Sequence, residues 1–147
     1  MAQRQTAEAW AQASLCVALV DDDEQIAEAM ALMLFLKGVR ACIYFSAESL
    51  LSCLSVVNGR LQLRTPEGDE YGLAAAVLDF NLPGVNGIDL LLQLRAMQAD
   101  LKVVLITAAL DSVVRQRTHD LKGVPCLFKP FDQRSVEAAI SLLAKAS

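Results

Sequence analysis

The sequence predicts an α/β domain built on a doubly wound, five-stranded parallel sheet with helices on both faces. Short apolar runs alternate with longer amphipathic ones along the chain, and uninterrupted apolar runs are typical of strands that are covered on both faces. The 147 residues, of which 54% are hydrophobic and 20% charged, suffice for one domain with a sizeable core. Because crossovers between parallel strands are right-handed, a doubly wound sheet is the natural arrangement.

The five predicted strands are runs of apolar residues. The first is continuously apolar, and the fourth consists almost entirely of β-branched residues and leucine. Such runs lack the alternation that a strand with one solvated face would show. The predicted strands are Leu15–Val20, Val39–Phe45, Ala74–Leu78, Lys102–Ile106 and Pro125–Phe128.

The predicted helices are recognised from helical spacing of apolar residues and from capping residues. In the first, Ile26, Met30 and Leu34 recur on one face, and Gly38 stands where helices commonly end. The second begins after Ser46, a favourable N-cap, and is expected to run to about Val57. The predicted helices are Glu24–Leu36, Ser46 to Val57, Gly87–Met97, one capped by Asp111 and one capped by Asp132.

Two segments fall outside this alternation. Residues 1–14 are rich in Ala and Gln, and we expect a flexible tail in front of a domain at 15–147. Residues 58–72 form a polar connection before the third strand, expected as an insertion. Alternating residues and a Thr65-Pro66-Glu67-Gly68 turn are compatible with either a small hairpin or a surface loop there.

Composition excludes several classes of function. The net charge of −4 lacks the basic face of a nucleic-acid-binding module, and one histidine excludes a multi-histidine metal site. The four cysteines form no C-x-x-C pair, so we expect buried free thiols rather than a zinc site or disulfides. No apolar run is long enough for a membrane span, and no signal peptide is recognisable, which favours the cytoplasm.

Acidic residues follow two predicted strands at one edge of the predicted sheet. Asp21, Asp22 and Asp23 come directly after the first strand, and Asp79 follows the third. Asp23 suits the N-cap of the next helix. In doubly wound sheets the functional crevice lies at the carboxyl ends of the strands, so we expect the other three carboxylates to converge there. They are the hard ligands that Mg²⁺ prefers; a solvated acidic turn is the alternative interpretation.

The loop after Asp79 contains residues that stiffen a turn. Pro83, Gly84 and Gly87 lead into the third predicted helix. We expect this turn to hold Asp79 and the nearby backbone carbonyl of Asn81 in a fixed geometry, although an ordinary strand-to-helix loop would show the same residue types.

Two further strand ends carry polar groups. Thr107 and the small Ala108 follow the fourth strand, where a hydroxyl can donate a hydrogen bond and leave access for a ligand. Lys129 follows the fifth strand between Phe128 and Pro130, and its charge suits a carboxylate cluster or a phosphoryl group. Taken singly, each could be an ordinary strand-end or surface residue.

Together these residues resemble the receiver domain of two-component response regulators, the CheY-like superfamily. The resemblance covers about Leu15 to Lys145 and implies a flavodoxin-like (βα)5 fold with strand order 2-1-3-4-5. The matching motifs are Val20-Asp21-Asp22, Asp79-x-x-x-Pro83-x-x-x-Gly87, Thr107-Ala108 and Lys129-Pro130-Phe131.

The resemblance implies that Asp79 is the phospho-acceptor. A Mg²⁺ ion would be held by Asp22, Asp79 and the backbone carbonyl of Asn81, with Asp21 contributing directly or through water. The physical reason is that a carboxylate is repelled by an anionic phosphoryl group, so transfer depends on positioning and charge neutralisation. The chain would then be a signalling switch rather than an enzyme, with Mg²⁺-dependent self-phosphorylation and self-dephosphorylation.

The resemblance also implies a switch around the phosphoryl group. Lys129 would balance one phosphoryl oxygen, Thr107 would donate to another, and Ala108 would leave room. In the family an aromatic residue usually stands three positions before the lysine and moves behind the threonine. Here that position is Cys126, so the usual aromatic coupling is in question, and Phe128 or Phe131 are the possible substitutes.

The phosphoryl donor is expected on a partner, either a sensor histidine kinase or a histidine phosphotransfer protein. The single histidine, His119, falls on a polar helix away from the strand ends. A downstream protein target and possibly a homodimer are expected, with no nucleic acid and no membrane.

Alternative functions are distinguished by what surrounds the site. The sequence ends at Ser147, directly after the last predicted helix, which favours a stand-alone receiver over a receiver fragment of a hybrid kinase or transcription factor. An aspartyl-phosphate phosphatase is disfavoured, because such enzymes carry a second aspartate two residues after the nucleophile, where this chain has Asn81. A degenerate receiver is disfavoured because all the charged site residues are present.

Overall fold

The computed structural model describes residues 15–107, 124–128, 134, 137–138 and 141. Strands dominate the described part of the chain, and three helices cover them. The helices are α2 (Glu24–Leu36), α3 (Ala47–Leu51) and α4 (Gly87–Met97). The strands are β1 (Leu15–Val20), β2 (Ala41–Tyr44), β3 (Leu54–Val57), β4 (Arg60–Arg64), β5 (Glu70–Asp79), β6 (Lys102–Thr107) and β7 (Cys126–Phe128).

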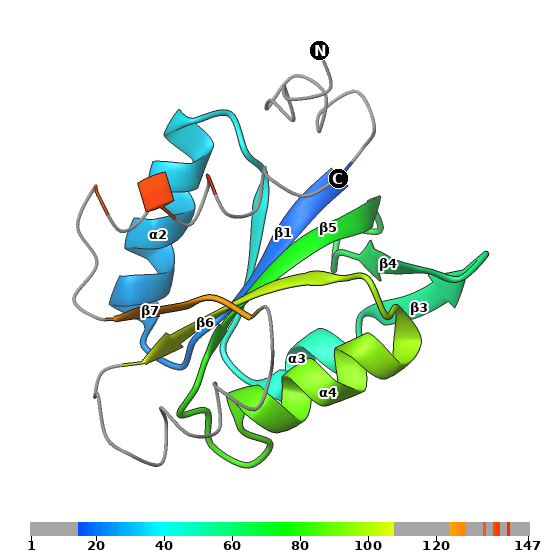
Figure 1. Ribbon diagram of the computed structural model, residues 1–147. Coiled ribbons are helices and arrows are strands. Elements are labelled where there is room, and N and C mark those ends of the chain that lie inside the picture. Colours follow the sequence, from blue (N-terminus) through cyan, green and yellow to red (C-terminus); the bar gives the residue numbers. More distant parts are fainter. Residues whose placement is uncertain (1–14, 108–123, 129–133, 135–136, 139–140, 142–147) are drawn as a thin grey trace.

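The parallel strands confirm the predicted topology. Their order is β2-β1-β5-β6-β7, which is the predicted 2-1-3-4-5 once the antiparallel strands β3 and β4 are set aside. β1 and β5 lie at the centre, so their carboxyl ends meet at one edge of the sheet (Figure 1). This topology brings residues that are far apart in the sequence to that edge.

The sheet has a hydrophobic layer on each face because side chains alternate along each strand. On β1, Val17 and Leu19 pack in the cluster that contains Met30 and Leu34 of α2. Cys16, Ala18 and Val20 point to the opposite face and join the larger cluster beneath α3 and α4. Figure 1 shows α2 on one face and α3 with α4 on the other, so the prediction of helices on both faces is confirmed.

The prediction of a helix continuing to Val57 is wrong. α3 ends at Leu51, and Leu54–Val57 form β3, the first strand of a β-hairpin with β4. Asn58 and Gly59 connect the two strands with positive φ angles of 53° and 77°, the conformation that two-residue hairpin turns require. The residues 58–72, which we predicted as a polar connection, are therefore largely strand. Of the two predicted alternatives, the small hairpin is correct for their first part.

The hairpin is joined to the sheet at the amino end of β5. β4 pairs with β5 in antiparallel register from Gln62↔Gly72 to Arg64↔Glu70. Beyond that point the side chain of Gln98 replaces a strand partner, because its Oε1 accepts the Leu61 N–H at 2.7 Å. Leu61 and Leu63 are buried against the α3–α4 face of the core (1% and 0% exposed), so the hairpin belongs to the folded core.

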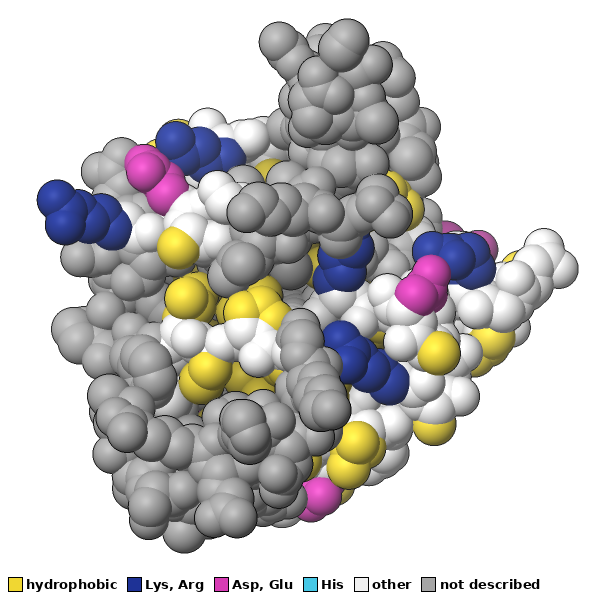
Figure 2. All heavy atoms as spheres, in the orientation of Figure 1, with side chains coloured by type: hydrophobic (Ala, Val, Ile, Leu, Met, Phe, Trp, Pro, Cys, Tyr) yellow, Lys and Arg dark blue, Asp and Glu magenta, His cyan; other side chains and the backbone are white. Residues whose placement is uncertain are grey.

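Charged residues of the hairpin lie on its surface. Arg64 pairs with Glu70 at 3.3 Å, and Arg60 pairs with Asp100 at 3.6 Å, all with side chains that are more than half exposed. Figure 2 shows basic and acidic side chains close together at the side of the molecule where Figure 1 places the hairpin. Within the described ranges, no helix has both the length and the apolar character that a membrane span requires.

The tail and one predicted helix fall outside the described residues, and the last predicted helix is described only in part. The tail at residues 1–14 and the helix capped by Asp111 lie outside the described residues, as do Asp132 and His119. Of the last predicted helix, four residues are described, and all four are helical; they are Arg134, Glu137, Ala138 and Ser141.

Candidate functional site

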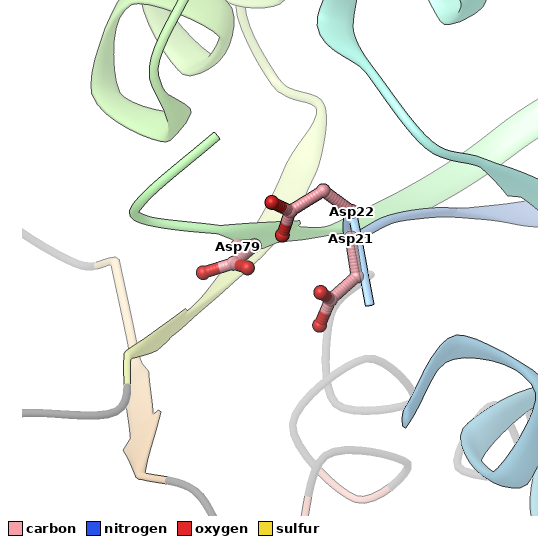
Figure 3. Close-up of side chains that lie close together, drawn as sticks. All are labelled: Asp21, Asp22 and Asp79. Atoms are coloured by element: carbon pink, nitrogen blue, oxygen red, sulfur yellow. The ribbon is translucent and has the colours of Figure 1, made fainter. Parts of the chain in front are cut away.

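Three carboxylates converge at the carboxyl edge of the sheet, as predicted. Asp21 and Asp22 follow β1, and Asp79 ends β5. One oxygen from each carboxylate lies within 4.8 Å of the others. Figure 3 shows the three side chains directed around one space between the ends of the two strands. The parallel pairing of β1 with β5, from Leu15↔Gly72 to Val20↔Leu78, is what brings them together.

Asp79 is held by the two strands beside it. It is 3% exposed and pairs with Ile106 of β6, while the preceding Leu78 pairs with Val20 of β1. Its Oδ1 accepts the Asn81 N–H at 3.1 Å. The backbone is thus fixed on both sides, and the local hydrogen bond orients the carboxylate toward the cluster.

The two aspartates after β1 differ in their environment. Asp21 is 2% exposed, its Oδ1 accepts the Asp23 N–H at 2.9 Å, and its own N–H donates to the Tyr44 carbonyl at 3.1 Å. Asp22 is exposed at the rim. Asp23 caps α2, as predicted, by accepting the Ile26 N–H at 3.2 Å. One buried and one exposed carboxylate therefore face Asp79 from the end of β1.

The loop from Phe80 to Gly87 approaches the Asp79 backbone closely. A Cβ on Gly87 would overlap the Asp79 carbonyl oxygen and would lie 2.9 Å from the Phe80 Cα. The Gly87 N–H donates to the Phe80 carbonyl at 3.1 Å, so only glycine permits this tight turn. Asn86, which is not among the predicted site residues, caps α4 by accepting the Asp89 N–H at 2.9 Å. An Asn directly before a helical run is the sequence signal for such a cap.

The other predicted turn residues lie in the same loop. Pro83 and Gly84 stand between β5 and α4, and Gly84 has a φ of 74°. That left-handed conformation suits glycine and lets the chain reverse toward Gly87.

Thr107 and Cys126 lie on the neighbouring strands β6 and β7. Thr107 ends β6, has no exposed surface, and pairs with Phe128 of β7. Cys126 pairs with Leu105 and is half-buried against the α3–α4 face of the core, where burial raises the pKa of its thiol. The structure thus places a small side chain at the position predicted to interrupt aromatic coupling. Ala108, Lys129, Pro130 and Phe131 lie outside the described residues.

The donor set of this cluster fits a hard divalent cation. Three carboxylate oxygens at such separations repel one another, and a bound cation relieves that repulsion. Because Asp22 is exposed, water can reach the carboxylate cluster. This suits Mg²⁺, which usually keeps several water ligands when it binds to a protein. The acidic cluster can therefore hold a magnesium ion, with Asp21, Asp22 and Asp79 as the residues available to it.

Comparison with known sequences gives matches over most of the chain. A family model described as "Response regulator receiver domain" matches residues 17–141. Among curated relatives, transcriptional regulatory protein FixJ of Azorhizobium caulinodans is 28% identical over 86% of this chain and 54% of its own length. The CpxR homolog of Haemophilus influenzae is 29% identical over 88% of this chain and 50% of its own length. This chain thus spans about half the length of these relatives.

Comparison with solved structures gives the fold independently. The non-phosphorylated HemR receiver domain from Leptospira biflexa superimposes with a TM-score of 0.69. The match covers 89% of this chain and 94% of that one at 22% identity. The superposition supports the parallel-sheet architecture described above.

Proposed function

The chain belongs to the response regulator receiver domain family of two-component systems, and from that premise we propose that it accepts a phosphoryl group on Asp79 and thereby changes its binding to a partner. The observation that carries the proposal is the convergence of Asp21, Asp22 and Asp79 at one edge of the sheet. We assign the acceptor role to Asp79 because it is the member that ends the central strand β5.

The reaction we propose is an in-line transfer from a phosphohistidine. A carboxylate oxygen of Asp79 forms a bond to phosphorus while the bond from phosphorus to the donor imidazole nitrogen breaks. The donor belongs to a sensor histidine kinase or a histidine phosphotransfer protein. Burial of Asp79 and its hydrogen bond from the Asn81 N–H keep the carboxylate in one orientation, which lowers the entropic cost of reaching the transition state.

We propose Mg²⁺ as the cofactor. Asp21, Asp22, Asp79 and the backbone carbonyl of Asn81 would hold it. When bound, the ion supplies positive charge that offsets the repulsion between an anionic phosphoryl group and the carboxylates. The same residues serve loss of the phosphoryl group to water, so the chain is proposed as a switch that resets itself.

The conformational output is proposed to begin at Thr107. This hydroxyl lies at the end of β6, one strand away from Asp79, so a phosphoryl oxygen on Asp79 offers it a new acceptor. Lys129 is proposed to balance a second oxygen, and Ala108 to leave room. Cys126 occupies the position three residues before Lys129, where the family usually has an aromatic residue, so we propose that the response travels through backbone movement of the β6 end, which pairs with Phe128 of β7.

The curated relatives indicate the larger proteins in which a receiver of this kind can occur. Both relatives described above are about twice as long as the matched region, and both are named transcriptional regulatory proteins. We propose that this receiver acts either by itself, through a downstream protein or a second copy, or as the input part of such a regulator in the cytoplasm. No part of the described surface is proposed to bind nucleic acid, since the net charge is −4.

Incubation with acetyl phosphate and Mg²⁺, followed by intact mass measurement, tests the proposal. We expect the mass to increase by one phosphoryl group, and the increase to vanish with a chelator or in Asp79→Asn. The matched control is Glu70→Gln, which removes a carboxylate at the other end of the same strand and should label normally. Absence of labelling from acetyl phosphate and from every phosphohistidine donor tried would overturn the proposal.

A further inference from the structure

All four cysteines lie on the α3–α4 face of the sheet, outside the carboxylate cluster, with Cys126 on β7 and the other three on β1, on β2 and after α3. Cys16 of β1 is fully buried, whereas Cys42 of β2 and Cys53 after α3 are half-buried. All three pack in or against the hydrophobic cluster beneath α3 and α4. The sequence contains no cysteine motif, so the fold itself creates this grouping.

Strand register places two of these thiols on the same face of neighbouring strands, as diagonal neighbours. In the parallel pairing of β1 with β2, Ala18 lies opposite Cys42. Cys16 is two residues before Ala18, so its side chain points to the same face as that of Cys42. A side-chain hydrogen bond joins the two thiols. Because the two cysteines are offset by two residues along their strands, a covalent bond between the sulfur atoms requires a shift of one strand relative to the other.

The two thiols differ in reactivity. The hydrogen bond that Cys16 gives to Cys42, together with its burial, raises the pKa of Cys16. The same hydrogen bond, which Cys42 accepts, and the nearby Arg40 guanidinium lower the pKa of Cys42 against the opposing effect of burial. Cys42 is also the more exposed of the two. Since the thiolate is the reactive form, the greater exposure of Cys42 and the lowering of its pKa favour Cys42 as the nucleophile and Cys16 as the resolving thiol.

We propose that a hydroperoxide oxidises Cys42 and Cys16 to a reversible disulfide between β1 and β2. The Cys42 thiolate attacks one peroxide oxygen, the O–O bond breaks, and the other oxygen leaves as hydroxide or alkoxide and takes up a proton. Cys42 is then a sulfenic acid. The Cys16 sulfur attacks the Cys42 sulfur, the S–S bond forms, and the hydroxyl group leaves with the Cys16 proton as water. One hydroperoxide is consumed for each disulfide.

The position of β2 makes the disulfide feasible and reversible. β2 has four residues and stands at one end of the strand order in the described sheet, with β1 as its neighbour there. A short end strand can shift more easily than β1 or β5, which are paired on both sides. A bond that requires such a shift is strained, and strained disulfides are the more easily reduced ones.

A consequence for the acidic cluster follows from the backbone. Tyr44 lies two residues after Cys42, and its carbonyl accepts the Asp21 N–H at 3.1 Å. A shift of β2 therefore moves the group that positions Asp21. This consequence rests on the proposed function: the oxidised protein should accept a phosphoryl group on Asp79 several-fold more slowly, and a dithiol reductant should restore the rate.

Peptide mapping of the full chain tests the disulfide independently of phosphorylation. The reduced protein is treated with hydrogen peroxide, remaining thiols are blocked, and trypsin digestion follows without reductant. Cys16 falls in the tryptic peptide 5–37, and Cys42 and Cys53 share the peptide 41–60. We expect the two peptides to be joined with a mass two hydrogens below their sum, and to separate after reduction.

Matched variants identify the two sulfurs. Cys42→Ser should abolish the joined peptide, whereas Cys53→Ser and Cys126→Ser should retain it, with circular dichroism verifying that each variant is folded. Absence of the joined peptide in the native chain, or a bond between Cys42 and Cys53 within peptide 41–60, would overturn the proposal.

Acetyl phosphate labelling of the two redox forms tests the consequence. A joined peptide with an unchanged labelling rate would refute the route through Tyr44. If neither redox form accepts a phosphoryl group, the proposed function fails while the peptide map still decides the disulfide.

Discussion

The two ends of β5 differ in how tightly the protein holds them. At the carboxyl end, Asp79 is 3% exposed and lies between parallel neighbours β1 and β6. At the amino end, Glu70 is an exposed residue that pairs with Arg64 of the hairpin, and both side chains are more than half exposed. One strand therefore carries a buried charge with a proposed function at one end and a solvated charge at the other.

This difference separates function from stability along one strand. A buried carboxylate among two others is costly unless a ligand or partner offsets the repulsion, so the charge at the carboxyl end fits the proposed cation site. At the amino end stability comes from the apolar face of the hairpin, and the charges above it matter little. Substitutions can test each half of this statement.

The largest expected effect on stability is at the amino end, in the hairpin core. Leu63→Ala removes a side chain with no exposed surface and should lower the free energy of unfolding by about 2–5 kcal/mol. Val57→Ala, at a side chain that is 49% exposed on the same hairpin, is the control and should cost less than about 0.5 kcal/mol. Denaturant unfolding measures both. Equal losses would contradict the hairpin's place in the core.

The next effect is at the carboxyl end and changes both stability and labelling. Gly87→Ala places a methyl group against the backbone of Asp79 and Phe80, which should cost about 1–3 kcal/mol. We also expect slower labelling by acetyl phosphate, because the Asp79 backbone is displaced. In the control, Gly72→Ala at the amino end, the new Cβ would lie 2.9 Å from the Leu15 Cδ2, the mobile end of a side chain. Normal labelling of Gly87→Ala would refute this role of the turn.

A comparable loss of stability without loss of labelling is expected for Gln98→Ala. The Leu61 N–H is buried and donates to Gln98 Oε1, so the variant leaves that donor without its acceptor at a cost of about 1–3 kcal/mol. Asp100→Asn, which keeps an oxygen acceptor for the Gln98 amide, is the control. Thermal unfolding and labelling of both variants provide the measurement; a labelling defect in Gln98→Ala would show that the two ends of β5 are coupled.

The smallest effect is expected for Arg64→Ala. The Arg64–Glu70 pair is solvent-exposed, so its removal should change stability by less than about 1 kcal/mol. The change should shrink further at high salt, because ions screen exposed charges. A larger, salt-insensitive loss in denaturant unfolding would mean that the amino end of β5 depends on its charges after all.

The sequence was sufficient for the elements whose pattern is local. The bounds of α2 and α4 agree with the spacing of their apolar residues, and Asp23 and Ser46 cap helices as predicted. The convergence of Asp21, Asp22 and Asp79 also followed, because carboxyl ends of parallel strands share an edge.

Features that depend on pairing between distant residues were missed. Leu54–Val57 continue an apolar run after α3, so they were interpreted as helix, although Asn58-Gly59 is a recognised hairpin turn signal. The pairing of β4 with β5 depends on contacts between residues far apart in the sequence. The same is true of the hydrogen bond from the Leu61 N–H to the Gln98 side chain. The diagonal placement of Cys16 and Cys42 on one face likewise arises from the register of β1 with β2.

The most direct test of the central claim is the identity of the phosphorylated residue. The labelled protein is treated with sodium borohydride, which reduces an aspartyl phosphate to homoserine, and the site is then read by peptide sequencing in a mass spectrometer. We predict homoserine at position 79 and at no other aspartate of the acidic cluster. Homoserine at position 21 or 22, or label retained on a different type of residue, would contradict the account.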